Sequence, residues 1–147
     1  MNTENSPDTS MSYLLDTSAL ITLIEKEPGM EQVRALLGKR TILLPFVTLM
    51  ETYYITLQEQ GQAIADKRYY LIKKLPVTIL WQVNENTLRL AARFKAAYWI
   101  SFADALIAGF TAAQNAILVH KDPEYEVLKD EIQLEPLPYK SKSVPSV

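Results

Sequence analysis

The chain has 147 residues, of which 48% are apolar and 22% are charged, with a net charge of −2 and a pI near 5.4. This composition is typical of one soluble globular domain and excludes disordered and fibrous proteins, while the slight acidity argues against broad contact with duplex nucleic acid. There is no cysteine, which excludes disulfide frameworks, zinc–thiolate sites and thiol nucleophiles. No apolar run reaches membrane-spanning length, so we expect a cytoplasmic protein.

Apolar runs and turn residues predict strands that alternate with helices. We expect a disordered tail over residues 1–11, a single domain over residues 12–137 and a loose tail over residues 138–147. Short apolar runs predict four strands and a candidate fifth, at residues 13–15, 41–44, 77–80, 117–119 and 132–136. Helical spacing and end signals predict helices at residues 19–24, 30–37, 46–60, 62–74, 85–98, 101–115 and 122–130, with Gly38 ending the second.

This order of elements predicts the fold class. Strands that are apolar throughout are buried on both faces, which requires helices on both sides of the sheet. The sequence therefore predicts an α/β fold: a three-layer α/β/α sandwich with a central parallel sheet of four to five strands.

Four acids lie in apolar or aromatic surroundings: Asp16, Glu51, Asp104 and Asp122. Three of them also have a simple structural explanation. Asp16 is suited to cap the first helix, Asp104 has capping-box spacing from a serine, and Asp122 precedes a proline and an acid at a helix start. Capping cannot explain Glu51, because it lies inside a helix among largely apolar neighbours, where an ionised acid needs a partner or must reach solvent.

The predicted fold gives these acids a common place. In a parallel sheet, residues that follow the strands and begin the next helices gather at the carboxyl edge, where ligands bind. Carboxylates held together there repel by roughly 3 kcal/mol per pair at about 5 Å, so a positive partner is needed. Oxygen ligands favour a hard cation, and we expect Mg²⁺ or Mn²⁺.

Four segments resemble the PIN-domain ribonucleases, especially the toxins of VapBC-type toxin–antitoxin pairs. They are LLDTSAL at residues 14–20, VTLME at 47–51, ISFADALIA at 100–108 and LVHKDPEY at 118–125. Each segment is weak evidence alone, but the four occur in the order and at the spacing of the family. The likeness covers about residues 12–137, the expected PIN domain.

The resemblance implies that the four acids bind one or two divalent cations and support hydrolysis of single-stranded RNA. It makes Thr17, Ser18 and Ser101 candidate supporting hydroxyls. It also implies a small antitoxin that covers the acidic cleft, and a homodimer formed through apolar helix faces. One departure is His120, where such toxins often carry threonine or serine; we expect this histidine to face solvent. For Glu124, compensation of a helix dipole is the favoured role over an outer-shell oxygen.

Basic and aromatic side chains are candidates for holding the RNA. The basic candidates are Arg89, Arg93 and Lys95, which share one predicted helix. Aromatic candidates for stacking on bases are Tyr53, Tyr54, Tyr98 and Trp99, although helical spacing favours core packing for them.

Other functions remain as alternatives. A haloacid dehalogenase-type phosphatase needs a second acid two residues after the first, but Ser18 stands there. A receiver domain needs an aspartate after the third strand, and residues 80–84 offer none. Structure-directed 5′ nucleases usually need more chain. The rival of a different class is a non-catalytic PIN-like module that binds RNA or protein, and the presence of all four acids counts against it.

Overall fold

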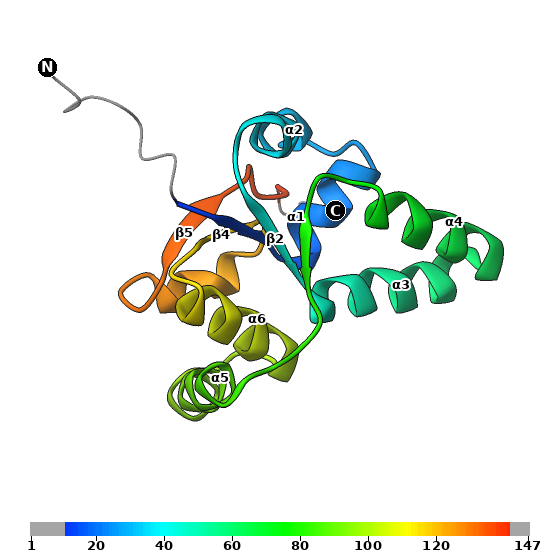
Figure 1. Ribbon diagram of the computed structural model, residues 1–147. Coiled ribbons are helices and arrows are strands. Elements are labelled where there is room, and N and C mark those ends of the chain that lie inside the picture. Colours follow the sequence, from blue (N-terminus) through cyan, green and yellow to red (C-terminus); the bar gives the residue numbers. More distant parts are fainter. Residues whose placement is uncertain (1–10, 142–147) are drawn as a thin grey trace, which may run out of the picture.

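Five parallel strands form the central sheet of the computed structural model, which describes residues 11–141 (Figure 1). The predicted N-terminal tail, apart from Met11, and residues 142–147 of the predicted C-terminal tail lie outside this range. The strands stand in the order β3-β2-β1-β4-β5, with the bounds β1 Tyr13–Leu15, β2 Ile42–Pro45, β3 Thr78–Leu80, β4 Ile117–His120 and β5 Gln133–Pro136. The predicted parallel sheet is confirmed, and the candidate fifth strand is part of it.

Within residues 11–141, six α-helices and one 3₁₀ helix connect and cover the strands. Their bounds are α1 Thr17–Ile24, α2 Met30–Lys39, α3 Phe46–Gln60, α4 Gln62–Lys73, α5 Glu85–Ala97, α6 Phe102–Ala113 and the 3₁₀ helix η1 Pro123–Leu128. The prediction that Gly38 ends the second helix is wrong, because α2 continues to Lys39 and the chain becomes extended at Arg40. Gly61 does end α3, at a left-handed φ of 88° that glycine adopts without strain.

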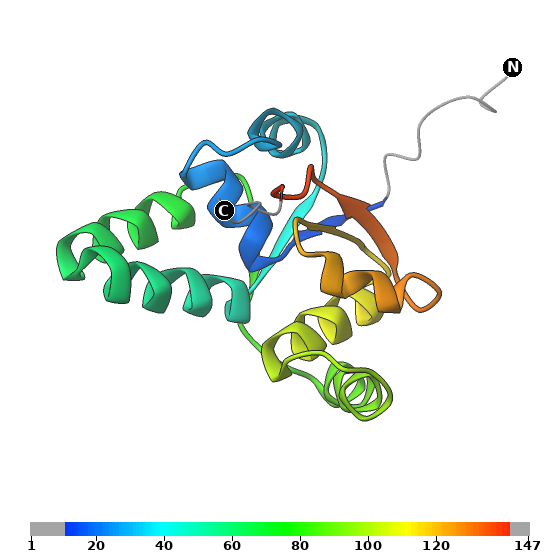
Figure 2. The same cartoon turned by 180° about the vertical axis from the view of Figure 1, so that it is seen from behind.

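The sheet has a core on each face, because neighbouring strand residues point to opposite sides. Leu14 and Leu118 face the core beneath α5, α6 and η1. Leu15 and Val119, one residue further along the same strands, face the core beneath α1 to α4. Figures 1 and 2 show these two helical layers from opposite sides. The predicted three-layer sandwich is therefore confirmed.

Helices α5 and α6 form a tightly packed pair, with a close contact at Gly109. A side chain at Gly109 would bring its Cβ within 2.7 Å of the Ala91 Cβ and 2.9 Å of the Thr87 carbonyl oxygen. Only glycine allows this approach. Asn84 caps α5 by accepting the Thr87 N–H at 2.8 Å, as its position in the sequence predicts.

The pairing of β1 with β4 determines where the candidate site forms. Tyr13 to Leu15 lie beside Ile117 to Val119 in parallel register, so the chain leaves both strands at the same edge of the sheet. The connections from β1 and β4 lead to helices on different sides, and such a divergence opens a crevice at the carboxyl edge.

Within the described residues, no helix combines the length and the apolar character needed to cross a membrane. The expected cytoplasmic location stays a prediction. Of the predicted C-terminal tail, residues 138–141 are described, and two of their side chains contact the domain. The Tyr139 hydroxyl donates to Glu126 at 2.9 Å, and Lys140 forms an ion pair with Glu27 at 2.9 Å.

Candidate acidic site

Asp16 lies directly after β1, at the centre of the carboxyl edge. Its backbone N–H donates to the Val119 carbonyl oxygen at 3.2 Å, which continues the pairing of β1 with β4. Its side chain accepts the Ala19 N–H at 2.8 Å and so caps α1, and only 3% of the residue is exposed. The capping role predicted for an isolated aspartate is real, and it holds the carboxylate at the edge of the sheet.

Ser18 connects Asp16 to the end of β4. Its hydroxyl lies 2.7 Å and 2.9 Å from the two carboxylate oxygens of Asp16, to which it donates. The same oxygen accepts the Lys121 backbone N–H at 2.8 Å, from a residue 103 positions further along the chain. One serine thus links the two loops that carry Asp16 and Asp122.

Glu51 reaches the same edge from the second turn of α3. The Thr48 hydroxyl donates to the Leu15 carbonyl oxygen at 2.9 Å and fixes the start of α3 against the end of β1. The Thr17 hydroxyl donates to Glu51 Oε1 at 2.6 Å. The partner of this half-buried acid is therefore a hydroxyl that follows Asp16, and Glu51 and Asp16 lie on the same side of the molecule.

Asp104 occupies the first turn of α6. The Ser101 hydroxyl oxygen accepts the Asp104 backbone N–H at 3.1 Å, which is one half of the predicted capping box. The Asp104 carboxylate does not need the reciprocal bond, because its Oδ1 accepts the Tyr125 hydroxyl at 2.9 Å. Tyr125 therefore contacts the carboxylate from outside α6, while the capping Ser101 hydroxyl also lowers the pKa of Asp104 against the rise caused by burial.

Asp122 follows β4 and caps η1 by accepting the Glu124 N–H at 2.9 Å. One carboxylate oxygen from each of Asp104, Asp122 and Glu124 lies within 4.8 Å of the other two. Dipole compensation was the favoured role for Glu124, but its carboxylate also joins this cluster. The structure thus adds an acid to those predicted for the edge.

The charges of these acids act on one another. Burial raises the pKa of Asp16 to about 7, and repulsion from Asp104 and Asp122 adds to the rise, while the bonds from Ala19 and Ser18 oppose it. Burial also raises the pKa of Asp104, with further contributions from Asp122 and Glu51, although its bond from Tyr125 opposes the rise. The four predicted acids therefore share one electrostatic environment.

No lysine or arginine within residues 11–141 forms an ion pair with any of the four acids. Within the described part of the chain, no ion pair offsets the repulsion between these acids. The available donors are carboxylate oxygens, which suit a hard divalent cation such as Mg²⁺ or Mn²⁺ and do not suit a soft metal. The donor set fits the expected ion.

His120 is not exposed, so the expectation that it faces solvent is wrong. It is fully buried as the last residue of β4, on the same face of the strand as Leu118. Its Nδ1 accepts the Asp122 backbone N–H at 3.2 Å, and its ring contacts Tyr125 at 5.2 Å between centroids. Burial lowers the pKa of His120. Residues two apart on a strand point to the same face, so the predicted burial of Leu118 was the signal in the sequence that His120 is also buried.

Tyr125 is the site residue that sequence reasoning missed. It is 1% exposed, yet its hydroxyl reaches Asp104. Burial raises the pKa of the Tyr125 hydroxyl well above its ordinary value, and the charges of Asp16, Asp104 and Glu51 act in the same direction. A buried tyrosine needs a partner for its hydroxyl, but the sequence does not show which one.

The basic residues predicted to hold RNA are placed on α5. Arg89 and Arg93 line a surface pocket with Glu85, Asn86 and Leu90, and Arg93 pairs with Glu131 at 3.0 Å. Lys95 donates to the Ile100 carbonyl oxygen at 2.9 Å, in the loop before Asp104. Their contact with RNA stays a prediction.

The aromatic candidates divide into packed and exposed side chains. Tyr98 packs against the core, and Tyr53 contacts the Tyr69 ring and donates to Asp66 at 2.5 Å. Trp99 is 97% exposed and Tyr54 is 41% exposed, so core packing was the wrong expectation for these two. Both are available for contacts outside the chain.

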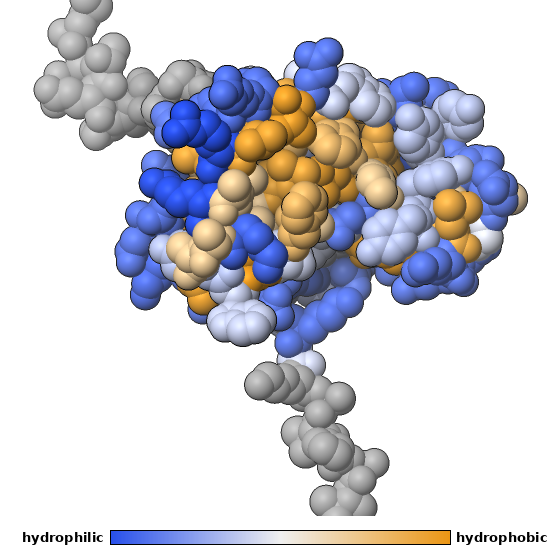
Figure 3. All heavy atoms as spheres, turned by 90° about the horizontal axis from the view of Figure 1, so that it is seen from below, coloured by the Kyte–Doolittle hydropathy of each residue, from blue (hydrophilic) through white to orange (hydrophobic). Residues whose placement is uncertain are grey.

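An apolar groove lies between α5 and α6, on the face shown in Figure 3. Its volume is about 650 Å³, and Leu88 and Phe102 are its most exposed apolar side chains, with 57% and 75% of their surfaces accessible. The residues that line it are Val83, Leu88, Ala91, Ala92, Lys95, Ala96, Phe102, Ala105 and Leu106. None of the four acids lines this groove.

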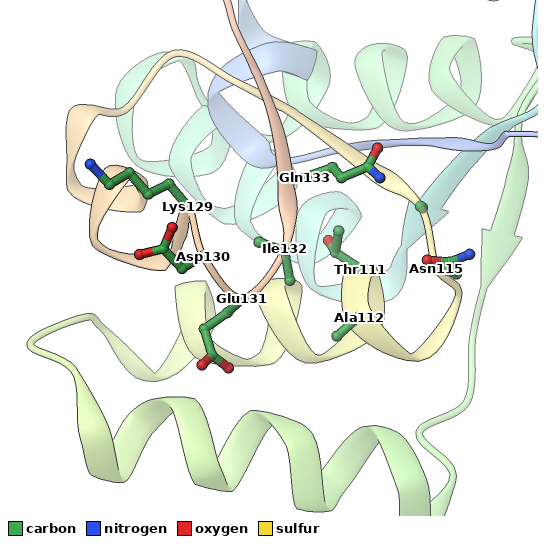
Figure 4. A pocket seen from close by; sticks show the side chains of 9 residues that line it. Thr111, Ala112, Asn115, Lys129, Asp130, Glu131, Ile132 and Gln133 are labelled. Carbon is green, nitrogen blue, oxygen red and sulfur yellow. The ribbon is translucent and has the colours of Figure 1, made fainter.

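A smaller crevice of about 290 Å³ lies at the opposite edge of the sheet (Figure 4). Asn115 and Ala116 precede β4, and Ile132 and Gln133 stand at the start of β5, so this crevice is at the amino ends of the strands. In Figure 4 the Asp130 and Glu131 side chains point away from each other. The crevice is separate from the acidic edge.

Comparison with solved structures supports the fold. VapBC2 from Rickettsia felis, bound to a DNA fragment from its promoter, is similar with a TM-score of 0.73 and 19% identity, over 86% of this chain and 99% of that one. VapBC-1 from nontypeable Haemophilus influenzae gives 0.69 and 24%, over 86% and 98%. The Sarcin-Ricin loop cleaving toxin VapC20 from Mycobacterium tuberculosis gives 0.63 and 15%, over 78% and 93%.

Sequence comparison identifies the family. No curated protein matches the chain in sequence. The sequence profile of the PIN domain, however, matches residues 13–131, which include all five acids of the edge and Tyr125. This match covers most of the chain, and the TM-scores show that the similar structures share its fold. The chain therefore belongs to the PIN-domain family.

Proposed function

We propose that this protein is an Mg²⁺- or Mn²⁺-dependent endoribonuclease that hydrolyses phosphodiester bonds of single-stranded RNA, and that it is the toxin of a toxin–antitoxin pair. The observation that carries the proposal is the meeting of Asp16, Glu51, Asp104 and Asp122 at one edge, where none of them forms an ion pair with a lysine or arginine of residues 11–141. Membership of the PIN-domain family, whose members are generally nucleases, supports the reaction class. The toxin assignment is supported by the similar VapBC and VapC20 structures.

In the proposed reaction, a water oxygen bonds to phosphorus, the bond to the leaving ribose oxygen breaks, and that oxygen takes up a proton. When bound, a divalent ion would neutralise part of the phosphate charge and lower the pKa of the attacking water toward neutrality. Asp104 and Asp122 would hold the ion with the carboxylate oxygens that do not bind Tyr125 and the Glu124 N–H, and Asp16 would join them with a carboxylate that also accepts the Ser18 hydroxyl. Thr17 occupies one oxygen of Glu51 and leaves the other free to join them.

The supporting hydroxyls have distinct parts in this proposal. Thr17 donates to one oxygen of Glu51, and Ser18 donates to the carboxylate of Asp16, so each hydroxyl fixes the orientation of its acid. Ser101 caps α6 and so fixes the backbone of Asp104. We propose Arg89, Arg93 and Lys95 as contacts to RNA phosphates; Lys95 lies beside the loop that leads to Asp104, which supports its inclusion.

Asparagine substitutions test the reaction. Asp16→Asn and Asp104→Asn keep the shape of the side chains and remove their charge, so Mn²⁺-dependent cleavage of a mixed-sequence RNA should fall by more than about 100-fold, beyond the loss typical of an outer-shell change. Asp130→Asn, at an exposed acid outside the cluster, is the matched control and should cleave as the parent does. Circular dichroism checks that the fold is kept.

Chelation and substrate choice separate the rival functions. Addition of EDTA should abolish cleavage, and excess Mn²⁺ should restore it. Binding of RNA without cleavage at saturating Mn²⁺ would instead support the non-catalytic module, and preferential cleavage of branched DNA would support a structure-directed nuclease. Full activity of the Asp16 or Asp104 variant would remove that residue from the proposed site.

We further propose two protein partners. One is a small antitoxin that covers the acidic edge, which would place cationic groups against carboxylates that lack them within the described chain. The other is a second copy of this protein, bound through the apolar groove of α5 and α6. Exposed apolar side chains such as Leu88 and Phe102 support contact with a protein surface there.

A further inference from the structure

Tyr125 joins the two segments that carry Asp104 and Asp122. It lies three residues after Asp122, on the 3₁₀ helix that Asp122 caps, and its hydroxyl donates to Asp104 Oδ1 on α6 at 2.9 Å. The ring is almost fully buried, so the position of the hydroxyl is set by packing. A single side chain thus connects the end of β4 to the start of α6.

His120 holds the Tyr125 ring from one side. The two rings meet edge to face with centroids 5.2 Å apart and an interplanar angle of 62°, an arrangement that aromatic pairs favour. The same imidazole accepts the Asp122 backbone N–H through Nδ1 at 3.2 Å. The histidine and the tyrosine therefore form one packed unit that contacts Asp122 through its backbone and Asp104 through its carboxylate.

The bond from Tyr125 also distinguishes the two oxygens of the Asp104 carboxylate, because it is made to Oδ1. Oδ1 is occupied by the phenol, which leaves Oδ2 as the oxygen that Tyr125 does not bind. The Ser101 hydroxyl, at the start of the same helix, also lies near this carboxylate and lowers its pKa against the rise caused by burial. A carboxylate that binds a metal through one oxygen is commonly oriented by a hydrogen bond to the other, and loss of such a partner costs about 10–100-fold in metal affinity or activity.

We propose that Tyr125 is a positioning residue, which orients Asp104 so that Oδ2 is presented to a divalent cation held with Asp16 and Asp122. This role rests on the proposed function, because it requires that the acids bind a metal. It assigns Tyr125 no contact with RNA and no part in proton transfer. Its effect should therefore appear first in metal affinity.

Tyr125→Phe removes the hydroxyl and keeps the ring that packs on His120. Tyr139→Phe is a closely matched control, because Tyr139 also contacts the His120 ring, with centroids 6.0 Å apart, and also donates to a carboxylate at 2.9 Å, that of Glu126. Isothermal titration of the metal-stripped full chain with Mn²⁺ should show at least about ten-fold weaker binding for Tyr125→Phe and unchanged binding for Tyr139→Phe.

The same comparison in an Asp104→Asn background tests whether Tyr125 acts through Asp104. The added effect of Tyr125→Phe on Mn²⁺ affinity should then disappear, as expected for residues that are coupled. Equal affinity losses in both backgrounds would overturn the proposal, and so would equal affinities of the two tyrosine variants in the parent. In RNA cleavage, kcat at low Mn²⁺ should fall and recover at high Mn²⁺, with KM for RNA unchanged.

The outcomes separate this inference from the function on which it rests. If Asp16→Asn and Asp104→Asn bind Mn²⁺ as tightly as the parent, the metal site itself fails, whatever Tyr125→Phe does. If both aspartate variants lose Mn²⁺ while Tyr125→Phe keeps it, the metal site stands and the positioning role is refuted.

Discussion

Asp16→Asn should stabilise the metal-free protein at high pH, although it removes a residue of the proposed site. In the folded chain the pKa of Asp16 is raised from 3.8 to about 7, mainly by burial. Between these values the folded protein keeps a proton on Asp16 that the unfolded chain releases. The contribution of Asp16 to stability should therefore decline as the pH rises from about 4 to about 7 and then level off.

The size of this effect follows from the pKa. One pKa unit corresponds to about 1.4 kcal/mol, so the rise to about 7 costs up to about 4 kcal/mol of folding free energy at pH 8. Asparagine carries no charge and still caps α1 through its side-chain oxygen. Its amide nitrogen cannot accept the Ser18 hydroxyl as the second carboxylate oxygen does, and the loss of this bond costs about 1 kcal/mol of the stability gained by removing the charge.

The net gain at pH 8 is therefore about 2–3 kcal/mol, or a rise in Tm of roughly 5–10 °C for a chain of this size. Differential scanning calorimetry of both proteins in EDTA, at pH 4 and pH 8, measures it. At pH 4 the difference should vanish or reverse. Excess Mn²⁺ at pH 8 should stabilise the parent more than the variant. The same Tm difference at both pH values would refute the reasoning.

Two further predictions concern the α5–α6 pair. Gly109→Ala should lower the free energy of unfolding, measured by urea titration, by about 1–3 kcal/mol, because its Cβ would collide with Ala91 and the Thr87 backbone. The control is Gly38→Ala, in open space on α2, which should raise the free energy of unfolding by up to about 1 kcal/mol. Leu88→Glu should change stability by less than about 0.5 kcal/mol yet convert the proposed dimer to a monomer in light scattering; a monomeric parent would contradict that proposal.

The sequence predicts the sheet and most helices because their signals are local. Apolar strands, the Asn84 and Ser101 caps and the glycine after α3 each depend on residues close in the chain. The prediction from Gly38 was wrong because glycine is typical of the position just after a helix, whereas α2 tolerates it within its last turn, one residue before its end.

The acids were also recognisable, because each interrupts an apolar segment. Their structural and functional explanations are not exclusive, since Asp16, Asp104 and Asp122 are held in place by the same local contacts that make them caps or first-turn residues. What the sequence could not show were contacts across elements. The hydroxyl of Tyr125 meets Asp104 only after η1 packs beside α6 (Figure 2).

The distance along the chain between the two loops at the acidic edge has a consequence for synthesis. Ser18 and Lys121, which join those loops, are 103 positions apart, and β4 must insert beside β1 before they can meet. A ribosome therefore releases most of the polypeptide before the carboxylates can assemble. Fragments that stop short of β4 lack Asp122 and Tyr125, so premature termination would yield products without the assembled acidic site.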